Sequence, residues 1–151
     1  MRTDEGSAAP SAEIVRDMPD ACAPNVHRSL LLEDAFQRAR ALIDAKYDDF
    51  QLTPAAVVQY VGCSRATLYR AFQQHGLTVS GYIQQVRLER VQRGLALVGS
   101  RIPISSIAMD CGFECLRHFH RRFKQVFGDT PGAYRHLLHR DAEVKRRHVP
   151  D

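Results

Sequence analysis

The sequence lacks the features that mark membrane and secreted proteins. No apolar run approaches the roughly 20 residues that a membrane-spanning helix requires, and the N-terminus has no continuous apolar segment of the kind found in signal peptides. The 151 residues include four cysteines whose spacing shows no disulfide framework, which favours a reducing compartment. We therefore expect a cytoplasmic protein without a membrane partner.

The sequence is also poor in the patterns that accompany catalysis. No nucleophile, base and orienting acid are grouped together, and no glycine-rich phosphate-binding loop is present. Alternating apolar and polar residues, which would indicate strands, do not rise above noise. The sequence therefore predicts an all-helical protein that is not an enzyme and needs no cofactor.

One group of metal-ligating residue types needs an explanation. Cys111, Cys115, His118 and His120 lie close together in the sequence, and zinc takes such ligands. On a helix, however, His118 and His120 diverge by about 200°, and Cys111 precedes the turn. We interpret the cysteines as buried packing residues. A redox- or metal-sensing binding module that uses Cys111, Cys115 and His118 is the alternative.

The charges are distributed unevenly along the chain. The formal net charge is +4, yet residues 1–50 carry 6 Lys and Arg against 10 Asp and Glu, whereas residues 51–151 carry 15 against 7. Basic surfaces bind polyanions because they release counterions from the phosphates. The basic part of the chain therefore favours a nucleic-acid partner.

The helical pattern begins after an unpatterned stretch. Residues 1–29 mix small residues, prolines and acids without a sustained period, and we expect a disordered leader there. A first amphipathic helix is predicted from Leu31 to about Tyr47. Residues 140–151 are expected to form a polar tail, which leaves one helical domain over residues 30–139.

A first helix-turn-helix unit is predicted over about residues 53–75. Thr53 and Ser64 have side chains that suit the caps of its two helices. Gly62 lies between the helices, where a left-handed backbone conformation makes the turn. The second of these helices is the third helix of the chain.

A long helix over about residues 78–98 follows the first unit. Its apolar side predicts burial against the units on either side of it. Arg87 and Glu89 lie on its charged side. We interpret them either as solvated charges or as members of a structural ion pair.

A second helix-turn-helix unit is predicted over about residues 103–127, and a final helix over about 130–138. Gly112 makes its turn, and three phenylalanines then recur every four residues, which stacks their rings on one helix face; they are Phe119, Phe123 and Phe127. The other face of this helix is basic and hydrogen-bonding. An aromatic seam that anchors a helix and a polar face that enters a DNA groove are what a helix-turn-helix requires.

The two units form an internal repeat. The first unit reads Val57-Val58-x3-Gly62-x5-Leu68-x3-Phe72. The second reads Ile107-Ala108-x3-Gly112-x6-Phe119-x3-Phe123. Farther along, Tyr82 after the first unit is echoed by Tyr134 after the second. The predicted fold is all-α, with two homeodomain-like helix-turn-helix subdomains joined by a long central helix.

Several motifs in and around the second unit match a known family. The long helix carries Arg87-Leu88-Glu89-Arg90. The second unit then carries Ile104-x2-Ile107-Ala108-x3-Gly112-Phe113 and Phe119-x2-Arg122-Phe123-Lys124-x3-Gly128-x-Thr130-Pro131-x2-Tyr134-Arg135. On these motifs, about residues 33–138 resemble the AraC/XylS family of bacterial transcription regulators. The resemblance implies that the third and sixth helices enter successive major grooves on one face of the DNA, about 34 Å apart.

The resemblance also implies which side chains contact DNA. The family's base-contacting positions fall on Ala66, Tyr69 and Arg70 in the third helix, and on Leu116, Arg117, His120 and Arg121 in the sixth. Two of them, Arg70 and Arg121, are suited to bidentate binding of guanine O6 and N7. Phosphate contacts are expected from Arg65, Arg122 and Lys124.

The function implied is that of a regulator which binds double-stranded promoter DNA in the nucleoid, contacts RNA polymerase and most often activates transcription. Many family members carry a large ligand-binding or dimerising domain ahead of the DNA-binding half, where this chain has residues 1–29. No small-molecule effector site is evident. A truncated DNA-binding fragment that occupies its sites without activating is an alternative.

Overall fold

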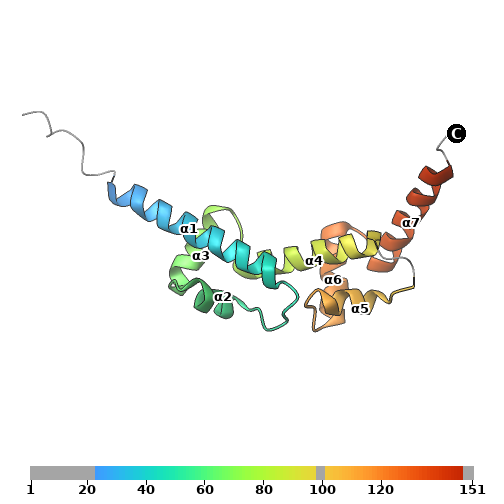
Figure 1. Cartoon of the computed structure of the whole chain (residues 1–151), viewed down its shortest axis with the longest axis horizontal. Coiled ribbons are helices and arrows are strands. Elements are labelled where there is room, and N and C mark those ends of the chain that lie inside the picture. The colour runs from blue at the N-terminus through green and yellow to red at the C-terminus, as the bar shows by residue number, and fades with distance from the viewer. Residues whose placement is uncertain (1–22, 98–100, 148–151) are drawn as a thin grey trace, which may run out of the picture.

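The structure is a computed structural model that describes residues 23–97 and 101–147, and these residues form seven helices and no strand (Figure 1). The helices are α1 (Ala23–Lys46), α2 (Pro54–Val61), α3 (Arg65–Gln74), α4 (Val79–Leu97), α5 (Ile104–Asp110), α6 (Leu116–Phe127) and α7 (Pro131–Arg147). The predicted all-α fold class is confirmed. Within the described ranges, no helix is both long and apolar enough to cross a membrane.

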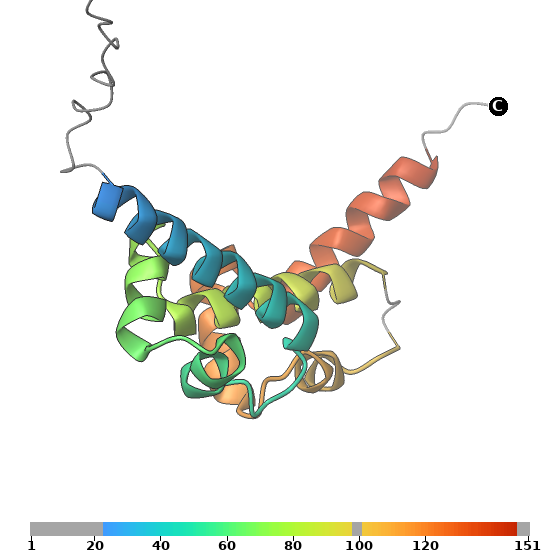
Figure 2. The same cartoon turned by 60° about the vertical axis from the view of Figure 1, so that its left-hand side comes forward.

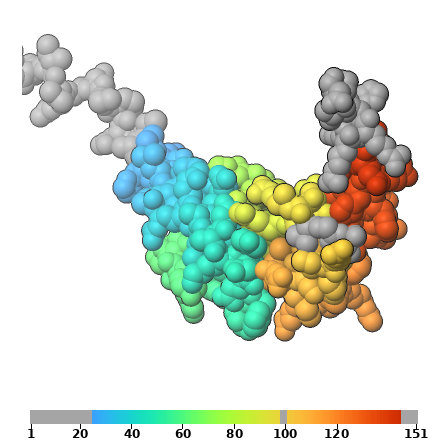
Figure 3. Space-filling view, turned by 45° about the vertical axis from the view of Figure 1, so that its right-hand side comes forward, coloured from blue at the N-terminus to red at the C-terminus, as the bar shows by residue number. Residues whose placement is uncertain are grey.

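The central helix α4 is shared by two hydrophobic cores. The first core packs α1, α2 and α3 against the start of α4, including Ile83 and Val86. The second core packs α5, α6 and α7 against the rest of α4, including Leu88, Val91 and Leu95. Figure 3 shows the consequence on the surface, where the segments before and after α4 form two lobes along its length.

The local signals for the first unit act as expected. The Thr53 hydroxyl oxygen accepts a hydrogen bond from the Ala56 backbone N–H at 3.2 Å, and the Ser64 hydroxyl oxygen accepts one from Thr67 N–H at 3.1 Å. Such caps satisfy backbone donors that have no partner within the helix. Gly62 has φ +71°, in the left-handed region, so both predicted caps and the predicted turn are confirmed.

Helix α1 begins at Ala23, eight residues before the predicted start at Leu31, so the expected leader is corrected over residues 23–29. Residues 23–29 carry no apolar stripe that would indicate a helix. Pro24 is the second residue of α1, and proline is tolerated in the first helical turn because its missing N–H would have no intrahelical partner there. Residues 1–22 lie outside the described part of the chain.

Helix α7 also extends beyond its prediction. It continues to Arg147 rather than ending near Leu138, so the expected polar tail is helical over 140–147. This segment contains arginine, lysine, glutamate and alanine, which favour helices intrinsically, and no glycine or proline. A helix whose first half is anchored by the buried Pro131 and the half-buried Tyr134 and Leu138 can therefore propagate into solvent without an apolar face. Residues 148–151 lie outside the described residues.

Candidate nucleic-acid interface

Helix α3 is anchored by one face and leaves the other free. Leu68, Ala71 and Phe72 are buried. The three residues expected to contact bases from this helix are all exposed: Ala66, Tyr69 and Arg70. The structure therefore brings these three together on the side of α3 that faces away from the first core.

Arg65, expected to contact a phosphate, lies one helical turn from Tyr69. Its guanidinium carbon is 5.3 Å from the centre of the Tyr69 ring, and its Nη2 donates to the Tyr69 hydroxyl at 3.5 Å. Both side chains are exposed. A cation held over an aromatic ring restricts both groups, so the arginine partly orders the tyrosine that flanks it.

Helix α6 is anchored by the predicted aromatic seam. Phe119 and Phe123 are fully buried, with ring centres 5.7 Å apart, and Phe127 lies 4.5 Å beyond Phe123. Tyr134 of α7 closes the stack at 5.5 Å from both Phe123 and Phe127. These rings are core residues, so they fix the orientation of α6 around its own axis.

The basic face of α6 is turned outward. Four residues expected at the interface are exposed: Arg117, His120, Arg121 and Lys124. Leu116 differs from them because it is half-buried and packs against the second core. Its position at the first residue of α6 still leaves part of the side chain accessible.

Arg122 lies apart from the other basic residues of α6. It is half-buried, and its Nη1 donates to the Gln125 side-chain oxygen at 3.2 Å. It lines a cavity of about 610 Å³ between α4 and α6, together with Gln85 and Glu89. Arg122 and Arg121 are successive residues on the helix, which points them about 100° apart.

The charge of both helices is entirely of one sign. Neither α3 nor α6 contains an aspartate or a glutamate. Their exposed faces therefore carry uncompensated positive charge together with hydrogen-bonding groups from Tyr69 and His120. Such faces suit a polyanion whose edges present hydrogen-bond acceptors.

Equivalent hydrogen bonds join the helices that flank α3 and α6. In the first unit, Arg40 Nε of α1 donates to the Tyr82 hydroxyl of α4 at 3.2 Å. In the second, Gln92 Nε2 of α4 donates to the Tyr134 hydroxyl of α7 at 2.6 Å. Gln92 follows Arg40, and Tyr134 follows Tyr82, by the same 52 residues. The internal repeat therefore extends to the bonds that join each unit to its flanking helices, which the sequence patterns did not reveal.

A buried arginine joins the two units. Arg87 of α4 is 6% exposed; its Nε donates to the Tyr47 carbonyl oxygen at 2.9 Å and its Nη2 to the Asp49 carbonyl oxygen at 2.7 Å. Burial lowers the pKa of the Arg87 guanidinium, and the nearby charge of Asp49 opposes that shift. Neither a solvated charge nor an ion pair describes this residue, so both interpretations of Arg87 from the sequence are wrong.

The turn of the second unit packs against Arg87 and the Tyr47 carbonyl oxygen. Gly112 has φ +82°, and a Cβ added there would collide with the Tyr47 carbonyl oxygen and with Arg87 Nε. The Arg90 guanidinium lies 4.7 Å from the centre of the Tyr47 ring. We name the residues Tyr47, Asp49, Arg87, Arg90 and Gly112 the junction. It holds the end of α1, the middle of α4 and the turn before α6 together.

The cysteines occupy different environments. Cys111 is buried, and its burial raises the pKa of the thiol to about 11. Cys115 is exposed. Across residues 23–97 and 101–147, no group of three or more His, Cys, Asp or Glu side chains is arranged to hold a metal ion.

Comparison with known proteins adds the following. Residues 57–136, more than half of the chain, match the family model described as a helix-turn-helix domain. The transcriptional activator NphR of Rhodococcus sp is 29% identical over 113 residues, which cover 75% of this chain and 32% of NphR. The HTH-type transcriptional activator RhaR of Escherichia coli (strain K12) is 41% identical over 76 residues, which cover 50% of this chain and 26% of RhaR. The match thus spans no more than about a third of either relative.

Solved structures resemble the fold closely. An AraC-type transcriptional regulator from Chromobacterium violaceum superposes with a TM-score of 0.62 at 30% identity, over 69% of this chain and 91% of that one. The C-terminal domain of AraT, a response regulator from Geobacillus stearothermophilus, superposes with a TM-score of 0.62 at 26% identity, over 68% of this chain and 84% of that one.

Proposed function

Because the chain belongs to the AraC/XylS family of helix-turn-helix transcription regulators, we propose that it reads promoter DNA with both α3 and α6 and activates transcription. The observation that carries the proposal is that α3 and α6 each expose a basic face without acidic residues. Equivalent hydrogen bonds join the two units to their neighbouring helices. Two such helices, each packed in a core that includes part of α4, suit two successive major grooves of a duplex.

Specific bases are read by the exposed side chains of the two helices. Arg70 and Arg121 each bind a guanine through O6 and N7, a contact worth about 1–3 kcal/mol of discrimination against the wrong base. Tyr69 and His120 add hydrogen bonds, and Arg117 adds a further donor. Ala66 and Leu116 provide apolar contacts.

The sequence-independent part of the affinity comes from phosphates. Arg65 and Lys124 are exposed beside the base-reading residues, where they reach the DNA backbone. Arg122 serves the same role from the edge of α6 after it leaves its bond to Gln125. Each such contact adds to the salt dependence of binding.

Activation of transcription is proposed because two similar proteins are activators. NphR and RhaR are both named as transcriptional activators, and activation requires a contact with RNA polymerase in addition to DNA binding. A chain that binds its sites without that contact would protect the promoter DNA in a footprinting assay and leave transcription from that promoter unchanged. In vitro transcription with purified polymerase separates the two outcomes.

The binding test is a selection of random duplex DNA by the purified protein. Two enriched motifs about 10–11 base pairs apart are expected, because successive major grooves on one face are one helical turn apart. One enriched motif would mean that a single helix reads bases. Absence of enrichment would overturn the proposal.

Arg121→Ala is the matching substitution. It is expected to weaken binding to the selected site by about 1–3 kcal/mol and to relax the preference at one base pair. Arg93→Ala, which removes an exposed arginine from α4, is the control. A uniform loss on all sequences would make Arg121 a phosphate contact instead.

A further inference from the structure

The part of α1 that lies before the predicted domain boundary lines a groove with α3. Helices α1 and α3 are in contact, and Figure 2 shows the start of α1 above α3. Because α1 has 3.6 residues per turn, Asn25, Arg28 and Ser29 continue the side of the helix on which Leu32 is buried. The inward side of α1 is therefore apolar along the core and polar at its N-terminal end.

These polar residues line a groove with α3. The groove has a volume of about 460 Å³, and α3 contributes Arg70, Gln73 and Gln74 to its other wall. Arg70 is the residue that we propose reads a guanine. The groove therefore flanks the base-reading side of α3 rather than the opposite side of the helix.

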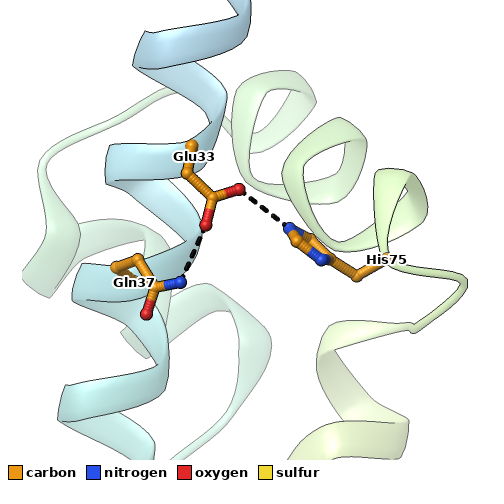
Figure 4. Close-up of polar contacts among 3 residues, drawn as sticks. All are labelled: Glu33, Gln37 and His75. Atoms are coloured by element: carbon orange, nitrogen blue, oxygen red, sulfur yellow. Dashed lines mark hydrogen bonds and ion pairs between the residues drawn. The ribbon is translucent and has the colours of Figure 1, made fainter.

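The groove carries positive charge alone. Its lining includes Arg28 and Arg70 and no carboxylate, and within the described ranges neither arginine forms an ion pair. The acids that follow on α1 are engaged elsewhere. Glu33 binds His75 at 3.0 Å and Gln37 at 2.7 Å (Figure 4), and Asp34 lies 3.6 Å from Arg38.

We propose that Arg28, supported by Asn25 and Ser29, binds a backbone phosphate of the duplex that α3 reads. This inference rests on the proposed function. The backbone strand that borders a major groove runs along the flank of the helix lying in that groove, and the wall that α1 adds to this flank presents a cation and two hydrogen-bonding side chains. The N-terminal end of α1 thus extends the interface beyond the helix-turn-helix.

The test measures affinity for the selected site against salt, using the full chain. Each phosphate contact contributes about 0.9 to the slope of log affinity against log salt. Wild type is therefore expected to lose about 3.5-fold more affinity than Arg28→Ala between 50 mM and 200 mM salt. The base preference is expected to stay unchanged, because a phosphate contact carries no sequence information.

Two controls separate this contact from general charge effects. Arg38→Ala removes an exposed arginine from the same helix outside the groove. Ser29→Glu adds a negative charge inside the groove, and Leu30→Glu adds one on the outer side, where Leu30 is 64% exposed. Ser29→Glu is expected to weaken binding several-fold more than Leu30→Glu, with equal helix content by circular dichroism.

The outcomes are distinct. Equal salt slopes for Arg28→Ala and Arg38→Ala, or equal affinities for the two glutamate variants, would overturn the contact while leaving the proposed function intact. A changed base preference in Arg28→Ala would overturn its assignment to a phosphate. Failure of wild type to bind any duplex would overturn both proposals together.

Discussion

Replacing Arg87 by methionine removes the cation at the centre of the junction and keeps an unbranched apolar side chain in place of its aliphatic part. In the wild type, the guanidinium donates to the carbonyl oxygens of Tyr47 and Asp49 at 2.9 Å and 2.7 Å. The variant leaves both acceptors without their donor. It therefore tests how strongly this contact stabilises the fold.

The size of the effect follows from these two bonds. A hydrogen bond from a charged donor contributes about 1.5–3 kcal/mol net, so two contribute about 3–6 kcal/mol. Burying the guanidinium offsets part of this, since the lowered pKa of Arg87 shows that the charged form is disfavoured there. We expect Arg87→Met to lower the free energy of unfolding by about 2–4 kcal/mol.

Urea unfolding followed by circular dichroism measures this difference. At about 2–4 °C per kcal/mol for a chain of this size, the melting temperature should fall on the order of 10 °C. Arg93→Met on the exposed side of the same helix should stay within about 0.5 kcal/mol of wild type. A change below about 0.5 kcal/mol in Arg87→Met itself would refute the reasoning, because it would mean that desolvation cancels both hydrogen bonds.

The same variant tests whether the junction sets the distance between the reading helices. Without Arg87, the second unit is connected to the first mainly through α4. DNA selected by the folded variant at low temperature should therefore show a broader range of spacings between its two motifs than DNA selected by wild type. An unchanged spacing would mean that α4 alone determines it.

Two further predictions concern single titratable groups. Iodoacetamide at pH 8 should modify Cys115 much faster than Cys111, because burial raises the pKa of the Cys111 thiol to about 11 and thiolates are the reactive form; equal rates by mass spectrometry would contradict this burial. The hydrogen bond from Gln37 lowers the pKa of Glu33 below its usual value of 4.5, so its contribution to stability is present above that pH and is lost as the pH falls through the lowered pKa. Glu33→Gln should therefore unfold at lower urea than wild type at pH 7 and at the same urea near pH 2; a gap that persists in acid would argue against the carboxylate.

Local signals in the sequence were sufficient for the helices and their faces. Phe119 and Phe123 are buried because a four-residue period places apolar groups on one side of any helix. Thr53 and Ser64 cap helices because their hydroxyls reach N–H groups only three residues away. Such interactions depend on near neighbours in the chain, so a pattern can predict them.

Contacts between segments distant in the chain could not be predicted from the spacing of apolar and polar residues. Arg87 lies among charged residues on α4, and nothing near it in the sequence indicates that carbonyls 40 and 38 residues earlier will surround it. The start of α1 was missed for a related reason, since Arg28 and its neighbours face α3 rather than forming an apolar stripe. The exposure of Arg70 and Arg121 agrees with the predicted interface, while their contacts with bases stay predictions.

Because both cores share α4, insertions and deletions in this helix are constrained during evolution. Val86 belongs to the first core and Leu88 to the second, so the boundary between the two cores falls within two residues of α4. Inserting or deleting one residue between them would rotate everything that follows by about 100° and shift it by about 1.5 Å. If both α3 and α6 read the duplex as proposed, the length of α4 is constrained by the pitch of the double helix, whereas the exposed side chains of the two helices can change without altering that length.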